Sequence, residues 1–173
     1  LLSDPGKLLV NYCVNMGITI IPIPGASSIT SALSVAGFKD QFLFYGFLPK
    51  TENELVKILT SLSQNEYSQI FFVPSKKINF YLKKFKEFYS GRKILIAKEI
   101  SKIHERFIRE DIDKLKVFDE PLKGEITIVI SERITKNRKF DEEKIVNNIK
   151  KYLKKYSLKD TVDLIVKAEK INR

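Results

Sequence analysis

The sequence predicts an α/β protein, a mixed-sheet α/β/α sandwich followed by C-terminal helices. Short β-branched and aromatic runs alternate with helical patterns, which is typical of a sheet covered by helices. The later strand patterns follow one another without a long helix between them, so we expect a mixed sheet. Of the 173 residues, 43% are hydrophobic and 30% are charged. This balance suits one folded domain with a short appendage.

The first expected elements are a helix and a buried strand. Ser3 can cap the helix with Pro5 in its first turn, and Gly17 is expected to end it in a left-handed conformation. The β-branched run at residues 18–23 then predicts a strand. The Pro24-Gly25 turn ends that strand, because neither residue fits the interior of a sheet.

The next elements continue the alternation of helices and strands. A helix rich in small residues is expected at 26–36, and a strand at 42–45. Thr51 and Glu54 form a capping-box pattern that opens a helix through about Ser63.

The second half of the sheet is expected to follow a basic helix. Strands are predicted at 69–73, 93–98 and 124–131, with 106–109 as an edge strand. An amphipathic basic helix is expected at 76–89. A further helix follows at 141–156, and Ser157 with Asp160 opens the last one by the same capping logic.

Positive charge is concentrated in two blocks. The net charge is +10, and residues 76–116 hold 13 basic and 6 acidic side chains, whereas residues 1–75 are nearly neutral. A second basic block lies at 131–173. Basic residues beside aromatic ones are typical of proteins that bind a phosphate backbone, and a solvated lysine-rich surface is the alternative. The candidates for this contact are Lys76, Lys77, Lys83 and Lys84.

Several classes of protein are excluded by composition. No apolar run is long enough to span a bilayer, so we expect no membrane contact. The single Cys13 rules out an internal disulfide framework and suits the reducing cytoplasm. One cysteine and one histidine cannot together build a His/Cys zinc site, so we expect no metal.

The turn after the first expected strand is the most informative local feature. The small residues Ser27 and Ser28 follow Pro24-Gly25 and open a helix. Backbone N–H groups at such a helix start favour anionic groups, and open α/β sheets bind ligands at the carboxyl ends of their strands. A tight turn packed with small residues for steric reasons is the alternative.

Four ionisable residues lie within seven positions just after the strand at 93–98: Glu99, Lys102, His104 and Glu105. Proton transfer needs titratable groups that converge, and a strand end is a rigid place to hold them. An exposed charged loop is the alternative interpretation.

Six short stretches, none specific alone, occur in an order and spacing that resemble one family. They are Ser3-Asp4-Pro5-Gly6, Pro22-Ile23-Pro24-Gly25-Ala26-Ser27, Ala32-Leu33-Ser34 with Gly37, Gly46-Phe47-Leu48-Pro49-Lys50, Lys98-Glu99-Ile100-Ser101-Lys102-Ile103-His104-Glu105, and Lys123-Gly124-Glu125. The family is the tetrapyrrole methylases. Within it, the sequence is most similar to the branch that methylates a cytidine 2′-hydroxyl of small-subunit (16S) ribosomal RNA.

The resemblance implies a cofactor and roles for named residues. S-adenosyl-L-methionine would be the methyl donor. The positions implied to contact it are Leu2, Ser27, Ser28, Val73, Ile96 and Ala97. The resemblance implies that Lys102, His104 and Glu105 lie near the target ribose. The candidates for the general base, which stays unassigned, are Lys102, His104 and Glu99. At residues 71–77 the chain departs from the family pattern, because an acid is lost and a His-Arg pair becomes Lys76-Lys77.

The resemblance covers the back part of a two-domain enzyme. We therefore expect a fragment that lacks the front domain and is inactive alone. Three parts are expected: residues 1–17 as the tail of the front domain or a linker helix, 18–134 as the C-terminal methylase domain, and 135–173 as a basic linker with a truncated helical appendage. The expected partners are small-subunit rRNA or the ribosomal subunit, and a second copy in a homodimer.

Two other functions stay open from the sequence. One is C-methylation of a tetrapyrrole precursor of the uroporphyrinogen or precorrin type, whose carboxylates also attract cations. The other is a non-catalytic domain that binds RNA or dimerises.

Overall fold

Five strands form one mixed sheet in the order β1-β2-β5-β3-β4. Their bounds are β1 Phe42–Phe47, β2 Ser68–Phe72, β3 Lys93–Lys98, β4 Arg106–Asp111 and β5 Ile126–Ile130. The pairing of β1 with β2 is parallel, and the other three pairings are antiparallel. It follows that β1, β2 and β3 run in one direction, while β4 and β5 run in the other. The mixed sheet and the edge strand β4 confirm the expectation from the sequence.

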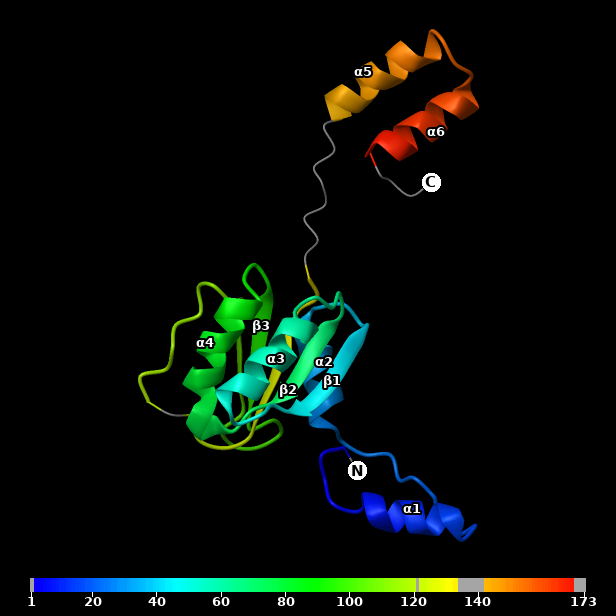
Figure 1. The fold of residues 1–173 in the computed structure, drawn as a ribbon. Helices are drawn as coiled ribbons and strands as arrows, with labels where there is room; N and C mark the ends of the chain where they lie inside the picture. Colours follow the sequence, from blue (N-terminus) through cyan, green and yellow to red (C-terminus); the bar gives the residue numbers. More distant parts are fainter. Residues whose placement is uncertain (1, 121, 134–141, 170–173) are drawn as a thin grey trace. The chain divides into compact units, whose positions relative to one another are not determined.

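Helices cover both faces of this sheet. The helices of the described chain are α1 Lys7–Asn15, α2 Ser28–Ala36, α3 Glu52–Leu62, α4 Ile78–Phe88, α5 Glu142–Leu153 and α6 Leu158–Glu169, with a 3₁₀ turn at Ser75–Lys77 before α4. Figure 1 shows α3 and α4 on one face and α2 on the other. The expected α/β/α sandwich is confirmed.

The computed structural model describes residues 2–120, 122–133 and 142–169. The chain divides into two compact units, Leu1–Ile134 and Thr135–Arg173. The expected linker at 135–140 lies outside the described residues.

The core is built on the alternation of side chains along the strands. In β3, Ile94 and Ile96 join the cluster under α3 and α4, whereas Leu95 and Ala97 join the cluster under α2. Successive residues of a strand point to opposite faces, so a strand buried on both sides has a continuous apolar sequence. All four side chains are almost fully buried.

Two buried polar side chains are satisfied within the larger cluster. The Tyr89 O–H donates to Gln69 Oε1, and burial raises the pKa of this phenol well above its ordinary value. Arg92 donates to the backbone carbonyls of Ser63, Asn65 and Ser131. These bonds tie the ends of α3, α4 and β5 together.

The expected strand at 18–23 is not formed, and this prediction was wrong. Residues 18–27 pair with no strand in the part of the chain that the structure describes. Ile21 and Ile23 are 79% and 91% exposed. A β-branched run becomes a strand only where a neighbour accepts and donates its backbone hydrogen bonds.

The first helix is also shorter than expected. It begins at Lys7 with Gly6 at its N-cap, so Ser3 does not cap it. Gly17 does adopt the expected left-handed conformation, with φ of 68°. No residue of α1 is buried, and Leu8 is 86% exposed.

The two capping boxes differ in how they are formed. Thr51 Oγ1 donates to the Glu54 carboxylate at 2.7 Å but makes no bond to the helix backbone. Ser157 accepts a bond from the Asp160 backbone N–H at 3.2 Å, so it caps α6 as predicted. Within this second unit α5 and α6 contact each other.

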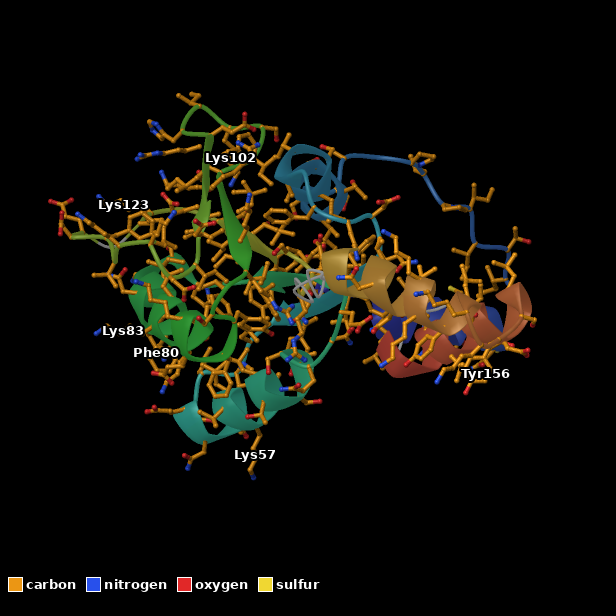
Figure 2. The ribbon with its side chains drawn as sticks, turned by 90° about the horizontal axis from the view of Figure 1, so that it is seen from above. Lys57, Phe80, Lys83, Lys102, Lys123 and Tyr156 are labelled. Carbon is orange, nitrogen blue, oxygen red and sulfur yellow. The ribbon has the colours of Figure 1, made fainter. Side chains whose placement is uncertain are left out.

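The basic surface expected from the composition is present. Lys57, Lys83, Lys102 and Lys123 are exposed and project outward from the ribbon (Figure 2). Among the described helices, none has the length and apolar character needed to cross a membrane. Within the same residues, no cluster of three metal-ligating side chains occurs.

Candidate functional site

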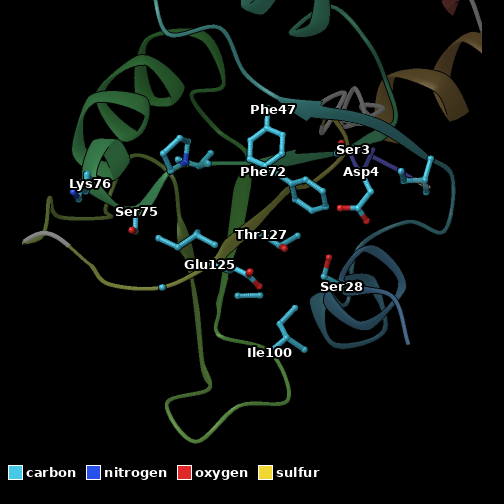
Figure 3. A pocket seen from close by; sticks show the side chains of 16 residues that line it. Ser3, Asp4, Ser28, Phe47, Phe72, Ser75, Lys76, Ile100, Glu125 and Thr127 are labelled. Carbon is cyan, nitrogen blue, oxygen red and sulfur yellow. The ribbon is translucent and has the colours of Figure 1, made fainter. Parts of the chain in front are cut away.

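A pocket of about 610 Å³ opens at one edge of the sheet. The carboxyl ends of β1, β2 and β3 meet at this edge because the three strands share a direction, and β5 begins there. Figure 3 shows the pocket between these strand ends and the start of α2. The lining residues are Leu2, Ser3, Asp4, Ser28, Phe47, Phe72, Val73, Pro74, Ser75, Lys76, Ala97, Ile100, Gly124, Glu125, Ile126 and Thr127.

One row of side chains across the sheet contributes to the pocket wall. Phe47 pairs in register with Phe72, Phe72 with Thr127, and Thr127 with Ala97. Residues in register point to the same face of a sheet. The Phe47 and Phe72 rings meet edge to face at 5.3 Å between centroids. The row thus presents aromatic surface next to a small side chain and a hydroxyl.

Residues from the chain start approach the sheet at the pocket. A Cβ built on Gly46 would lie 3.1 Å from Ser3 Oγ, and Gly46 has a φ of 88°. Glycine at this position therefore permits the close approach of the Ser3 side chain. The Asp4 carboxylate and the Ser28 hydroxyl both line the pocket.

A charged network lies at the other rim. Glu99 Oε1 accepts the Glu125 backbone N–H at 2.8 Å and the Lys102 ammonium at 3.0 Å. The same ammonium lies 3.2 Å from Glu125 Oε2. A Cβ on Gly124 would overlap the Glu99 carboxyl group, and Gly124 has a φ of 92°. Glycine at 124 therefore leaves the space from which the Glu99 carboxyl group accepts the backbone N–H just before β5.

The network shifts the pKa of both Glu99 and Lys102. The Glu125 backbone N–H, and then the Lys102 ammonium, lower the pKa of Glu99. The carboxylates of Glu99 and then Glu125 raise the pKa of Lys102. Hydrogen bonds to a charged form stabilise that form. At neutral pH the network therefore holds one ammonium between two carboxylates.

The structure brings together four of the six positions implied to contact a methyl donor. Leu2, Ser28, Val73 and Ala97 line the pocket. The other two are not among the lining residues: Ser27 and Ile96. Ser27 is the N-cap of α2, and Ile96 is fully buried on the α3 and α4 face because it neighbours Ala97 in the pleat.

The catalytic candidates lie at the rim or beyond it. Glu99 and Lys102 contact Glu125, which lines the pocket. His104 is exposed, and within the described residues it takes part in no hydrogen bond or ion pair. The structure thus joins two of the three candidates and leaves the imidazole apart.

The four candidate lysines differ in their surroundings. Lys76 lines the pocket and also a neighbouring cleft, and Lys77 lines that cleft. Lys84 lies 2.7 Å from Glu52 and 3.0 Å from Glu87. Its charge is therefore partly neutralised. Lys83 is exposed and lines neither hollow.

Several lining residues received no role from the sequence: Asp4, Phe47, Phe72, Glu125 and Thr127. Three of them lie in stretches that carried the family resemblance. The signal that could have found them is their position at strand ends, since Phe47 and Phe72 are the last residues of β1 and β2.

The similar proteins found by comparison of sequences share one name. No family model matches the chain. The protein named "Ribosomal RNA small subunit methyltransferase I" from Thermotoga maritima is 36% identical over 133 residues, which is 75% of this chain and 60% of that protein. Proteins of the same name from Rickettsia prowazekii and Bacillus subtilis are 36% and 30% identical and match 84% and 82% of this chain. The chain spans about half the length of these last two, 54% and 49%.

Solved structures share the fold at low identity. The methyltransferase CobJ superposes with a TM-score of 0.54 at 17% identity, over 73% of this chain and 56% of its own. Uroporphyrin-III-C-methyltransferase from Thermus thermophilus has a TM-score of 0.51 at 14% identity, over 76% of this chain and 59% of its own. The fold is therefore that of the tetrapyrrole methyltransferases.

Proposed function

We propose, on the premise that this chain is a relative of the proteins named ribosomal RNA small subunit methyltransferase I, that it forms part of an S-adenosylmethionine-dependent rRNA methyltransferase. The substrate is small-subunit rRNA, and the acceptor is the 2′-hydroxyl of a cytidine ribose. The observation that carries the proposal is the convergence of the strand-end loops on one pocket. Its volume lies in the range of about 300–1,000 Å³ that is usual for small-molecule sites.

The pocket residues fit the chemistry of the methyl donor. Phe47 and Phe72 offer aromatic surface for an adenine ring, and Thr127 offers a hydroxyl beside them. Asp4 offers a carboxylate for a cationic group, and Ser28 a hydroxyl at the start of α2. When bound, the donor supplies an electrophilic methyl group.

The chain's own residues would orient the ribose and manage its proton. Because Lys102 is held between two carboxylates and its pKa is raised, it stays protonated and suits an anionic or hydrogen-bond-accepting group of the RNA. The Glu99 carboxylate is already engaged by two donors. His104 makes no hydrogen bond or ion pair in the described residues, and the general base stays unassigned between His104 and Glu99.

The remainder of the enzyme is also part of the proposal. The relatives are longer than this chain, and we propose that the segment equivalent to their additional length closes the pocket from the other side. The chain alone is then inactive. The assembled enzyme is a homodimer in the cytoplasm, and light scattering after size exclusion would return twice the protomer mass.

The direct test uses a strain in which the gene that encodes this chain is disrupted. Nucleosides of its small-subunit rRNA are expected to lack one 2′-O-methylcytidine by mass spectrometry, and the gene in trans restores it. Unchanged ribose methylation would reject the proposal. Labelled methyl transferred to a uroporphyrinogen instead of rRNA would decide for the tetrapyrrole alternative.

A lysine substitution tests the role of the rim network. Lys102→Ala in the complete enzyme is expected to lower turnover by about tenfold or more, within the range for positioned polar groups, while donor affinity changes less than twofold. Lys114→Ala is the matched control, since Lys114 makes a similar pair with Asp111 at 2.8 Å, at the end of β4 away from the pocket. Equal losses of turnover and donor affinity would show that Lys102 only supports the fold.

A further inference from the structure

We infer that a second cleft, next to the pocket, binds a single-stranded segment of the RNA through its phosphates and one stacked base. The phosphates lie on three lysines and the base lies on Phe80. This inference rests on the proposed RNA substrate and adds where the strand runs beside the reacting nucleotide. The three lysines are Lys50, Lys76 and Lys77.

The cleft is formed where the loop after β1 meets the start of α4. It has a volume of about 370 Å³ and is lined by Lys50, Glu52, Lys76, Lys77 and Phe80. Residues far apart in the sequence therefore meet in one hollow.

The loop that carries Lys50 is held against α4. The Tyr81 O–H donates to the Pro49 carbonyl at 3.1 Å, and Tyr81 itself is fully buried. Leu48, on the same loop, is also buried in the core. The backbone of the loop that carries Lys50 is thus held in place by the core, which favours a well-defined binding site.

The charge of the cleft is positive and uncompensated. Within the described chain, Lys50, Lys76 and Lys77 form no ion pair, whereas Glu52 lies 2.7 Å from the Lys84 ammonium. The carboxylate of the cleft is therefore neutralised from outside, and the three lysines bring like charges, which repel one another, into one cleft. Bringing an anion between them removes this repulsion.

The position of two of the lysines adds to the argument. Lys76 and Lys77 form the 3₁₀ turn at the N-terminal end of α4. Cations near a helix N-terminus oppose its dipole, whereas a phosphate there is stabilised by it. A bound phosphate would offset both the repulsion among the lysines and the unfavourable interaction of Lys76 and Lys77 with the helix dipole.

Phe80 supplies the surface for a base. Its ring meets the Tyr81 ring edge to face, with centroids 5.2 Å apart, and it stays only partly buried beside the cleft. Aromatic side chains beside a basic groove stack unpaired bases and bind single strands with little sequence preference. A duplex would hide its bases from this ring.

The cleft and the pocket share one lining residue. Lys76 lines both hollows. A single-stranded RNA segment whose phosphates lie along the cleft therefore reaches the rim of the pocket. The cleft binds the nucleotides next to the acceptor nucleotide. It thereby positions the acceptor ribose without contacting that ribose.

Binding of a fluorescein-labelled 12-nucleotide oligouridine to the full chain, followed by anisotropy between 50 and 200 mM KCl, tests this inference. Lys50→Gln/Lys77→Gln is expected to weaken binding about tenfold at low salt and to reduce the salt slope by about 0.7 per lysine. The control Lys57→Gln/Lys116→Gln removes the same charge from exposed sites outside the cleft, as Figure 2 shows for Lys57, and is expected to bind within about twofold of wild type.

Phe80→Leu separates stacking from charge. It keeps apolar volume against the core, and binding of oligouridine is expected to fall about fivefold or more while binding of inorganic polyphosphate is unchanged. Undetectable RNA binding by the wild type, or equal losses in the cleft and control variants, would overturn the inference. A cleft that behaves as expected in a protein that restores no rRNA methylation would instead reject the proposed function alone.

Discussion

Gly124 is expected to maintain the rim of the pocket, and its replacement by alanine tests this. A Cβ at this position would overlap the Glu99 carboxyl group, and the backbone has a φ of 92°. Gly91 is the matched control, because its φ is 79° but nothing lies within 4 Å of an added Cβ. The two substitutions share the backbone strain and differ only in the clash.

The expected magnitudes follow from these two contributions. A left-handed conformation costs an L-residue about 1–2 kcal/mol, partly offset by the stiffer unfolded chain, so Gly91→Ala should lower the free energy of unfolding by about 1 kcal/mol. Loss of the hydrogen bonds that Glu99 makes adds to this at the other site, so Gly124→Ala should lower it by about 2–3 kcal/mol. To relieve the overlap, Glu99 must release the Glu125 backbone and Lys102.

Urea denaturation followed by circular dichroism measures both effects, since the chain contains no tryptophan. In a Glu99→Ala background, Gly124→Ala should cost no more than Gly91→Ala, because the clashing group is gone. Donor affinity of the complete enzyme should fall for Gly124→Ala and not for Gly91→Ala. Equal destabilisation by the two glycine substitutions in the wild-type background would refute the reasoning.

Three further outcomes are expected. The Glu125 backbone N–H, and then the Lys102 ammonium, lower the pKa of the Glu99 carboxyl, so its contribution to stability is present above its ordinary pKa and is lost on acidification. The urea midpoint should therefore fall more steeply below about pH 5 for wild type than for Glu99→Gln. Parallel pH profiles of the two proteins would contradict this. Tyr89→Phe leaves the buried Gln69 oxygen without its donor and should cost about 1–3 kcal/mol in urea denaturation, whereas an unchanged midpoint would mean that this bond contributes nothing. Leu55→Ala, at a fully buried site, should cost about 2–5 kcal/mol, while Leu8→Ala, at an exposed one, should stay within about 0.5 kcal/mol; a large loss at the second site would show that α1 is packed in solution.

Much of the fold follows from local patterns. The strand expected at 93–98 is β3 over the same residues, and the Ser157–Asp160 pattern caps α6 as predicted. Such elements depend on neighbours a few positions away in the chain. The strand expected at 18–23 fails for the opposite reason, because its hydrogen bonds need a partner from elsewhere.

The family resemblance and the strand-end position of the site were readable from the residues in order. Which side chains meet was decided only by the sheet. Ala97 lines the pocket and Ile96 does not, since the pleat sends neighbours to opposite faces. Glu125 lies beside the ends of β1 and β2 because antiparallel β5 starts where they end, and Asp4 joins them from the start of the chain. Periodicity and helix caps are properties of a short segment, whereas strand register and strand direction are properties of the whole sheet. The site depends on register and strand direction.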